Sequence, residues 1–125
     1  MIIGTGIDIV ELSRIKSAYD RWGAQFAERI LAREEIDVLK NRKEIYSYLG
    51  SRFAAKEAFL KALGTGYADG ISWHDMEIER LEGKRPGIKV AGRAREIMTE
   101  IGATNIHLSI SHEKKYTIAQ VILEG

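Results

Sequence analysis

One long helical pattern constrains the fold of this chain more than any other feature. Between Glu44 and Leu63, apolar residues recur near the 3.6-residue period of an α-helix. Four residues of this stretch are alanines, at positions 54, 55, 58 and 62, so neighbouring elements can pack close to the helix. Gly64 follows, where a helix commonly ends in a left-handed residue. The pattern therefore predicts a central helix over residues 44–63.

Alternation of polar and apolar residues predicts strands around this helix. The expected strands are residues 2–10, 75–81, 88–90, 105–112 and 116–123. Turns at 82–87 and 113–115 would join the last four strands into two antiparallel hairpins. Gly4 and Gly6 in the first strand indicate a bulge or a close approach of two backbones.

Shorter helices complete the pattern. Ser13 is a candidate N-cap for a first helix, and Gly23 divides that stretch into two pieces. Further helices are expected over residues 32–40 and 91–101. The fold class is therefore predicted to be α+β, with an antiparallel β-sheet packed against a long central helix and shorter helices.

Length and composition limit the possible functions. The 125 residues, 45% hydrophobic and 30% charged, predict a single domain over residues 1–125 that could share its core or active site in an oligomer. The chain has no cysteine, which excludes thiol catalysis and fits the reducing cytoplasm. We expect no membrane segment and no signal peptide, because apolar runs fall short of ~18 residues and Asp8 interrupts the N-terminal run. A net charge of +1 gives no support to nucleic-acid binding.

Charge is nevertheless concentrated in one segment. Residues 12–33 contain five basic residues and two acidic ones, a local excess of +3. Two interpretations stay open, a solvated helix face and a docking surface for an acidic partner.

Two carboxylates stand out as candidate metal ligands. Asp8 lies in an otherwise apolar strand, where a carboxylate is costly unless it is exposed, paired or bound to a cation. Glu57 lies among small alanines, although with Lys61 it could simply form an i, i+4 pair on an exposed helix. Hard oxygen ligands favour Mg²⁺, whose remaining ligands are usually water and substrate phosphate oxygens.

Positive and polar groups surround these carboxylates in the sequence. Arg52, Lys56 and Lys61 add positive charge beside Glu57, and Gly64-Thr65-Gly66 could offer backbone N–H groups to a phosphate. His112 could contact an anion or be an ordinary surface histidine. Ser111 and His112 are adjacent in a strand and face opposite ways, which argues against a Ser-His hydrolase. From the residues alone we expect a Mg²⁺-dependent site for a phosphoanhydride, lined by Arg52, Lys61 and His112.

Three blocks of the sequence resemble a known family. The blocks are Gly6-Ile7-Asp8-Ile9 continuing to Arg14, Phe53-Ala54-Ala55-Lys56-Glu57 continuing to Gly64, and Ser109-Ile110-Ser111-His112. Their order and spacing over nearly the whole chain resemble the holo-acyl-carrier-protein synthases, the small type of 4′-phosphopantetheinyl transferase. One departure is Gly83-Lys84-Arg85-Pro86, where the family more often has one residue fewer before the proline.

The resemblance implies a specific reaction. Such enzymes transfer the phosphopantetheine arm of coenzyme A to a serine of apo acyl carrier protein and release adenosine 3′,5′-bisphosphate. By resemblance, Asp8 and Glu57 would bind Mg²⁺, and Lys61 would neutralise charge at the transferred phosphate. Glu57, directly or through a water, is the favoured base for the serine proton, and Asp8 is the alternative.

The resemblance also implies roles for other residues. Arg52, Ser111 and His112 would contact nucleotide phosphates, and Gly64 and Pro86 would border the adenine or ribose. Arg14 and Arg21 would face the acidic carrier. Members of the family are typically homotrimers with active sites between subunits, and Gln120 and Val121 are candidate subunit contacts.

Three other functions stay open at the level of sequence. They are a non-catalytic module that binds nucleotides, a Mg²⁺-dependent phosphohydrolase that uses water as acceptor, and a structural trimer without a ligand.

Overall fold

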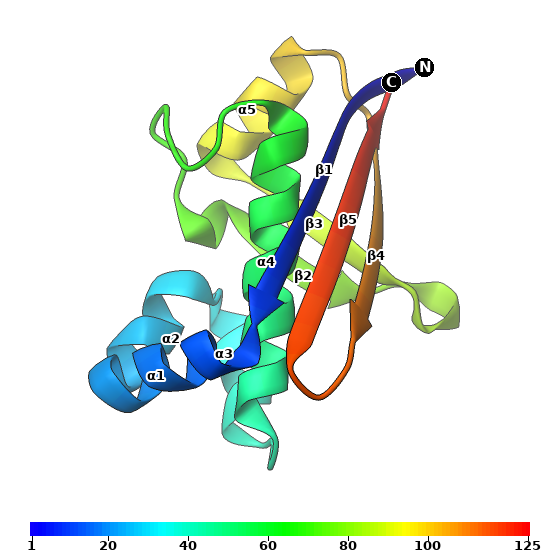
Figure 1. Ribbon diagram of the computed structural model, residues 1–125. Coiled ribbons are helices and arrows are strands. Elements are labelled where there is room, and N and C mark those ends of the chain that lie inside the picture. Colours follow the sequence, from blue (N-terminus) through cyan, green and yellow to red (C-terminus); the bar gives the residue numbers. More distant parts are fainter.

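The central helix is present as expected. The computed structural model describes residues 1–125, apart from the side chain of Lys84. Helix α4 (Ile45–Leu63) runs through the middle of the molecule (Figure 1). The Glu44 side chain accepts hydrogen bonds from the first backbone N–H groups, and Gly64 ends the helix with φ 87°. Both ends are thus capped as the sequence predicts.

A three-stranded antiparallel sheet lies along one side of α4. Strands β1 (Ile2–Glu11), β5 (Tyr116–Glu124) and β4 (Asn105–His112) follow the order β1-β5-β4 (Figure 1). Along β1, every second residue faces α4, and these residues include Gly6, Asp8 and Val10. The predicted hairpin of β4 and β5 is confirmed.

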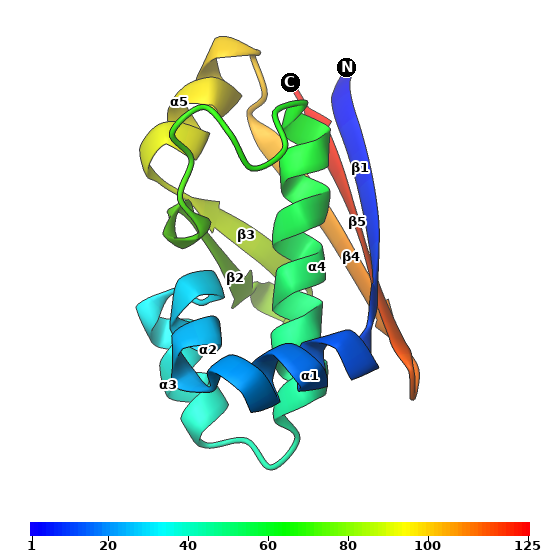
Figure 2. The same cartoon turned by 60° about the vertical axis from the view of Figure 1, so that its left-hand side comes forward.

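The other predicted hairpin forms a second, separate sheet. Strands β2 (Met76–Arg80) and β3 (Pro86–Val90) pair with each other, after the short 3-10 helix η1 (Trp73–Asp75) and around η2 (Glu82–Lys84). Figure 2 shows this pair across α4 from the three-stranded sheet. The α+β prediction is confirmed, with the strands divided between two sheets.

Four shorter helices cover the ends of α4. They are α1 (Leu12–Trp22), α2 (Ala24–Ile30), α3 (Arg33–Lys40) and α5 (Gly92–Glu100). The break at Gly23 is confirmed, with φ 59° at that residue. In the part of the chain that the structure describes, no helix has the length and apolarity of a membrane span.

The predicted N-cap at Ser13 is wrong. Helix α1 begins at Leu12, directly after the last residue of β1, so Glu11 is at the N-cap position and Ser13 lies within the first turn. The backbone N–H of Leu12 donates to the carbonyl oxygen of Lys115 at 2.8 Å. The β4–β5 turn thus satisfies one of the N–H groups at the start of the helix that have no partner within it.

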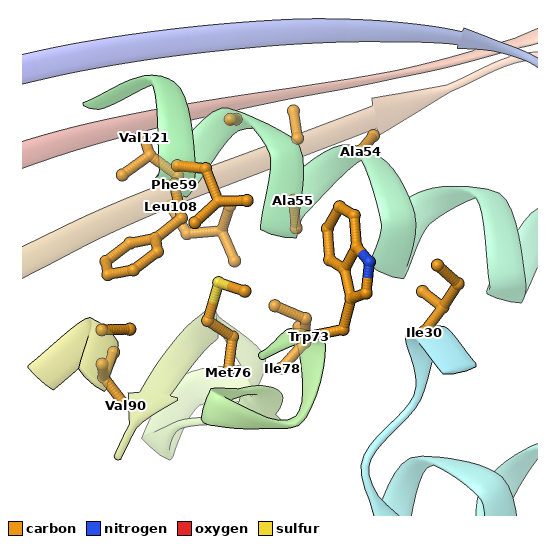
Figure 3. Packing of buried hydrophobic residues seen from close by; sticks show 14 of the residues in the cluster. Ile30, Ala54, Ala55, Phe59, Trp73, Met76, Ile78, Val90, Leu108 and Val121 are labelled. Atoms are coloured by element: carbon orange, nitrogen blue, oxygen red, sulfur yellow. The ribbon is translucent and has the colours of Figure 1, made fainter. Parts of the chain in front are cut away.

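The core fills the space between α4 and the two sheets. Figure 3 shows Phe59 of α4 between Val121 and Leu108 of the three-stranded sheet and Met76 of β2. Phe59, Met76 and Val121 are fully buried, and burying such side chains contributes about 1.5–3 kcal/mol each. The expectation that Val121 contacts another subunit is therefore wrong, because its side chain points into the core of its own chain. Gln120, the neighbouring candidate, is exposed.

Strand β1 and helix α4 approach each other unusually closely. A Cβ atom on Gly6 would lie 2.0 Å from the carbonyl oxygen of Ala58, and one on Gly4 would lie 2.1 Å from that of Ala62. The glycines and alanines therefore let the two backbones touch, as the sequence indicated. The register of β1 against β5 also shifts between Ile2 and Gly4, where a bulge was the other expectation. Asp8 follows Gly6 on the same face, so this contact determines how near Asp8 lies to α4.

Candidate active site

Asp8 and Glu57 line one pocket, although 49 positions separate them in the sequence. This pocket, here called the carboxylate pocket, has a volume of about 540 Å³. Strand β1, helices α1, α2 and α4, and the start of β5 contribute its walls. Its lining residues are Asp8, Ile9, Val10, Glu11, Arg14, Ile15, Phe26, Phe53, Glu57 and Tyr116.

Lys61 lies against Asp8. Its Nζ donates to Asp8 Oδ1 at 2.9 Å and to the carbonyl oxygen of Ile7 at 2.9 Å. The Asp8 side chain is only 15% exposed, whereas that of Lys61 is half exposed. One helical turn separates Lys61 from Glu57, so both side chains project from α4 toward β1. The structure thus brings together the three residues that the sequence assigned to the chemistry.

The surroundings of Glu57 affect its ionisation. Burial raises the pKa of Glu57, the negative charge of Asp8 raises it further, and the nearby Lys61 ammonium opposes both effects. Two half-buried carboxylates facing one pocket are an environment that a cation would relieve.

The donor set of this pocket fits Mg²⁺. Within the described residues, no group of three or more His, Cys, Asp or Glu side chains is placed to hold a metal ion. Asp8 and Glu57 would supply two carboxylate ligands and leave the remaining positions to water and substrate oxygens, which is the usual arrangement for Mg²⁺.

Lys56 does not belong to this site, contrary to expectation. Its side chain is fully buried, and its Nζ donates to Glu35 Oε1 and to the carbonyl oxygen of Ile30, both at 2.7 Å. Burial lowers the pKa of Lys56, and the charge of Glu35 opposes this shift. Lys56 lies next to Glu57 in the sequence, but consecutive helical residues point about 100° apart. Its positive charge therefore neutralises Glu35 in the core and does not face the carboxylate pocket.

A second pocket collects the other predicted ligands. This pocket, here called the arginine pocket, has a volume of about 280 Å³ and includes Arg52 from α4, Pro86 from β3 and His112 from β4. Burial lowers the pKa of Arg52. The other residues that line it were not predicted from the sequence, and they are Arg42, Ser47, Tyr48, Ser51, Glu79, Arg80 and Ile110. The only sequence feature that pointed to these residues is the basic pair Arg42-Lys43 before α4, and a pair of residues shows no helical periodicity.

The remaining predicted site residues lie outside both pockets, except Arg14. Ser111 is exposed on the face of β4 opposite His112, and Gly64 caps the far end of α4. Arg14 is at the rim of the carboxylate pocket with its side chain 85% exposed. Arg21 lies farther along α1, where its guanidinium stacks on the Trp22 ring at 5.0 Å.

Comparison with known proteins identifies the family. The family model of the 4′-phosphopantetheinyl transferase superfamily (ACPS) matches residues 4–121. A holo-[acyl-carrier-protein] synthase of Maridesulfovibrio salexigens is 47% identical over 124 residues, which is 99% of each chain. One from Koribacter versatilis is 44% identical over 124 residues, again 99% of each chain.

Solved structures agree with the sequence comparison. Holo-[acyl-carrier-protein] synthase from Neisseria meningitidis superimposes with a TM-score of 0.92 at 37% identity, covering 100% of both chains. The enzyme from Bacillus anthracis, in complex with CoA (3′,5′-ADP), superimposes with a TM-score of 0.82 at 38% identity and covers 98% of this chain and 96% of that one. The chain belongs to the 4′-phosphopantetheinyl transferase superfamily, among the holo-[acyl-carrier-protein] synthases.

Proposed function

We propose that this chain transfers the 4′-phosphopantetheine group of coenzyme A to a serine of apo acyl carrier protein, with Mg²⁺ as cofactor. The observation that carries this proposal is that Asp8 and Glu57 line one pocket while Lys61 forms an ion pair with Asp8. Relatives that are structurally similar over nearly their whole length have been solved with coenzyme A, including the enzyme from Helicobacter pylori, with a TM-score of 0.82.

Asp8 and Glu57 would hold Mg²⁺ in the carboxylate pocket. When bound there, the ion would offset the negative charge of the coenzyme A pyrophosphate and of the departing phosphate. The Lys61 ammonium lies beside Asp8 and adds a fixed positive charge at the same place. Positioning and electrostatic stabilisation together supply most of the acceleration in phosphoryl transfer.

The reaction itself balances simply. The serine oxygen of the carrier forms a bond to the β-phosphorus of coenzyme A, and the bond from that phosphorus to the bridging oxygen breaks. Adenosine 3′,5′-bisphosphate leaves with the electron pair. Glu57 would take the serine proton, directly or through a water. Asp8 is already bonded to Lys61 and is the second candidate.

The arginine pocket would bind the nucleotide end of coenzyme A. Arg52 and His112 would contact its phosphates, and Pro86 would border the adenine or ribose. Gly64 and Ser111 line neither pocket, so their proposed nucleotide contacts require a second subunit or a movement of the chain.

A homotrimer with active sites between subunits accounts for the two pockets. The carboxylate pocket and the arginine pocket share no lining residue. In the proposed trimer, one subunit would contribute Asp8 and Glu57 to an active site, and its neighbour would contribute Arg52 and His112. The outer face of the three-stranded sheet supports assembly. On this face Ile7 is 59% exposed and Ile9 is 60% exposed. Contact with another copy of the chain would remove these apolar side chains from water. Gln120 is exposed and stays a candidate contact.

Helix α1 would dock the carrier. Arg14 lines the carboxylate pocket and is largely exposed, and Arg21 is two helical turns further on the same side. Their positive charges would attract an acidic carrier and bring its serine toward Glu57. We also infer that the chain works in the cytoplasm as a single domain over residues 1–125, which its lack of cysteine and its full-length match to relatives support.

The decisive experiment is mass spectrometry of apo acyl carrier protein after incubation with the protein, coenzyme A and Mg²⁺. The proposal expects a mass gain of one phosphopantetheine group and stoichiometric adenosine 3′,5′-bisphosphate. Nucleotide binding without a mass gain would instead indicate a binding module. Release of the bisphosphate without carrier would indicate a hydrolase. If coenzyme A does not bind at all, the protein would be purely structural.

A further inference from the structure

The arginine pocket contains a group that the proposed function leaves without a role. Tyr48 of α4 is only 4% exposed, and its ring faces two guanidinium groups. The Cζ of Arg52 lies 4.1 Å from the ring centroid, and the Cζ of Arg42 lies 4.9 Å from it. Arg52 belongs to α4, and Arg42 belongs to the connection between α3 and α4. The ring therefore contacts guanidinium groups from two segments of the chain.

Neither arginine forms an ion pair within the described part of the chain. Arg52 Nη1 donates to Ser51 Oγ at 3.0 Å, and Arg42 Nε reaches the carbonyl oxygen of Glu44 at 3.5 Å. The Nε of Arg52 is buried and has no hydrogen-bond partner among the described residues. Glu79 lines the same pocket but forms no ion pair with either guanidinium group, so both keep donors for a ligand, and two guanidinium groups on one ring favour an anion with two charges.

Tyr48 is itself fixed from two directions. Its hydroxyl donates to the carbonyl oxygen of Glu35 at 3.2 Å, and its own carbonyl oxygen accepts from Ser51 Oγ at 2.8 Å. Because Ser51 Oγ also accepts from Arg52, the ring and this hydroxyl together hold Arg52 in place.

The partner of the Tyr48 hydroxyl is anchored deep in the core. The Glu35 carboxylate accepts hydrogen bonds from the buried Lys56 at 2.7 Å and from the backbone N–H of Ile78 at 2.8 Å. Ile78 belongs to β2, which also contributes Glu79 and Arg80 to the lining of the arginine pocket. One buried network therefore joins the Tyr48 hydroxyl to a strand that lines the same pocket.

We infer that Tyr48 is a positioning residue whose ring holds Arg42 and Arg52 together as a receptor for a phosphate monoester. An aromatic face attracts guanidinium groups and carries no negative charge that would neutralise them. It can therefore hold both arginines in place while they stay available to a ligand. This inference rests on the proposed function, in which the nucleotide of coenzyme A enters this pocket.

The test compares two nucleotides and three proteins. Binding of adenosine 3′,5′-bisphosphate and of adenosine 5′-monophosphate is measured by calorimetry with the wild type, Tyr48→Leu and Tyr48→Phe. Tyr48→Leu removes the aromatic face and is expected to weaken bisphosphate binding about tenfold or more, and monophosphate binding less than about twofold. Tyr48→Phe keeps the face and is expected to stay within about twofold of the wild type for both. In the transfer assay, Tyr48→Leu should raise KM for coenzyme A and leave kcat and the carrier KM unchanged.

Three results would overturn the inference. They are unchanged binding in Tyr48→Leu, an equal loss for both nucleotides, and a wild type that binds both nucleotides equally. If circular dichroism shows that Tyr48→Leu is unfolded, Tyr48→Met fills the same space without an aromatic face and carries the same expectation. A wild type that discriminates between the nucleotides but transfers nothing would refute the proposed function and leave this inference standing.

Discussion

The ammonium of Lys61 lies 2.9 Å from the carboxylate of Asp8, although 53 positions separate the two residues in the sequence. The contact joins α4 to β1 at the carboxylate pocket, beside Glu57. Lys61 thus partly balances two carboxylates that share a half-buried site. A charged Glu57 is unfavourable there, and the proposed divalent cation would relieve that cost.

The first prediction concerns the stability of the metal-free protein. The pKa of Glu57 is raised in the folded state, first by burial and then by Asp8, so deprotonation of Glu57 disfavours folding. Protonated Glu57 makes its full contribution to the free energy of unfolding below the ordinary glutamate pKa. This contribution is lost as the pH rises through the raised pKa of the folded state. Glu57→Gln should therefore raise Tm at pH 7.5 in EDTA and leave it almost unchanged near pH 4. Thermal unfolding at both values checks this, and an equal Tm for variant and wild type at pH 7.5 would contradict it.

The same electrostatics predict the titration of Glu57 in variants. Asp8→Asn removes the like charge and should lower the pKa of Glu57, whereas Lys61→Met removes the opposing charge and should raise it. Carbon-13 NMR titration of the Glu57 carboxyl measures both shifts. Shifts of the same sign in the two variants would show that changed burial, and not charge, dominates this site.

The close contact of β1 with α4 gives a prediction about geometry. Gly6→Ala would place a Cβ 2.0 Å from the carbonyl oxygen of Ala58, and a backbone atom cannot rotate away. We expect the variant to lose about 1–3 kcal/mol of stability. It should also lose most transfer activity, because β1 carries Asp8 away from Glu57. Thr5→Ala, on the outer face of β1, is the control and should keep its stability within about 0.5 kcal/mol. A Gly6→Ala protein with normal stability and activity would show that the strand tolerates displacement.

The buried Lys56–Glu35 pair predicts non-additive mutations. Lys56→Met leaves the Glu35 carboxylate buried without its cation and should cost about 3–5 kcal/mol. Lys56→Met combined with Glu35→Gln removes both charges and should cost less than the sum of the two single changes. Urea unfolding of the four proteins measures the coupling. Strict additivity would mean that the two charges do not stabilise each other.

Docking of the carrier is testable through charge reversal. Arg14→Glu should raise KM for the carrier about tenfold and KM for coenzyme A less than about twofold, and added salt should shrink the difference. Arg95→Glu makes the same charge change on the exposed face of α5 and serves as the control. An equal rise of both KM values in Arg14→Glu would place the carrier elsewhere.

Local patterns predicted most of the fold. The period of residues 44–63 and the alternation of residues 105–123 depend only on burial along one element, so α4 and the β4–β5 hairpin match expectation. The start of α1 does not match expectation, because the carbonyl group that satisfies the Leu12 N–H belongs to Lys115, about a hundred residues later in the chain. Long-range hydrogen bonds of this kind leave no local signal.

The candidate site was predictable in its residue types and less so in its arrangement. Asp8, Glu57 and Lys61 meet as expected, because a carboxylate in an apolar strand needs a cation. The sequence also suggested that Arg52 shares their site. It lies five residues before Glu57, which places it about 140° away around the helix, and it enters the arginine pocket instead. Glu35 gave no signal, since a buried partner for Lys56 cannot be recognised without the tertiary structure.

The central claim is that Asp8 and Glu57 together make the carboxylate pocket the place of transfer. The most direct measurement is the rate at which apo acyl carrier protein gains mass with coenzyme A and Mg²⁺, for the wild type, Asp8→Asn, Glu57→Gln and Glu11→Gln. Glu11 lines the same pocket and is the matched control. We predict that Asp8→Asn and Glu57→Gln, both folded, lose at least about 100-fold in rate, while Glu11→Gln stays within about threefold of the wild type. Near-normal transfer by both Asp8→Asn and Glu57→Gln would contradict the claim.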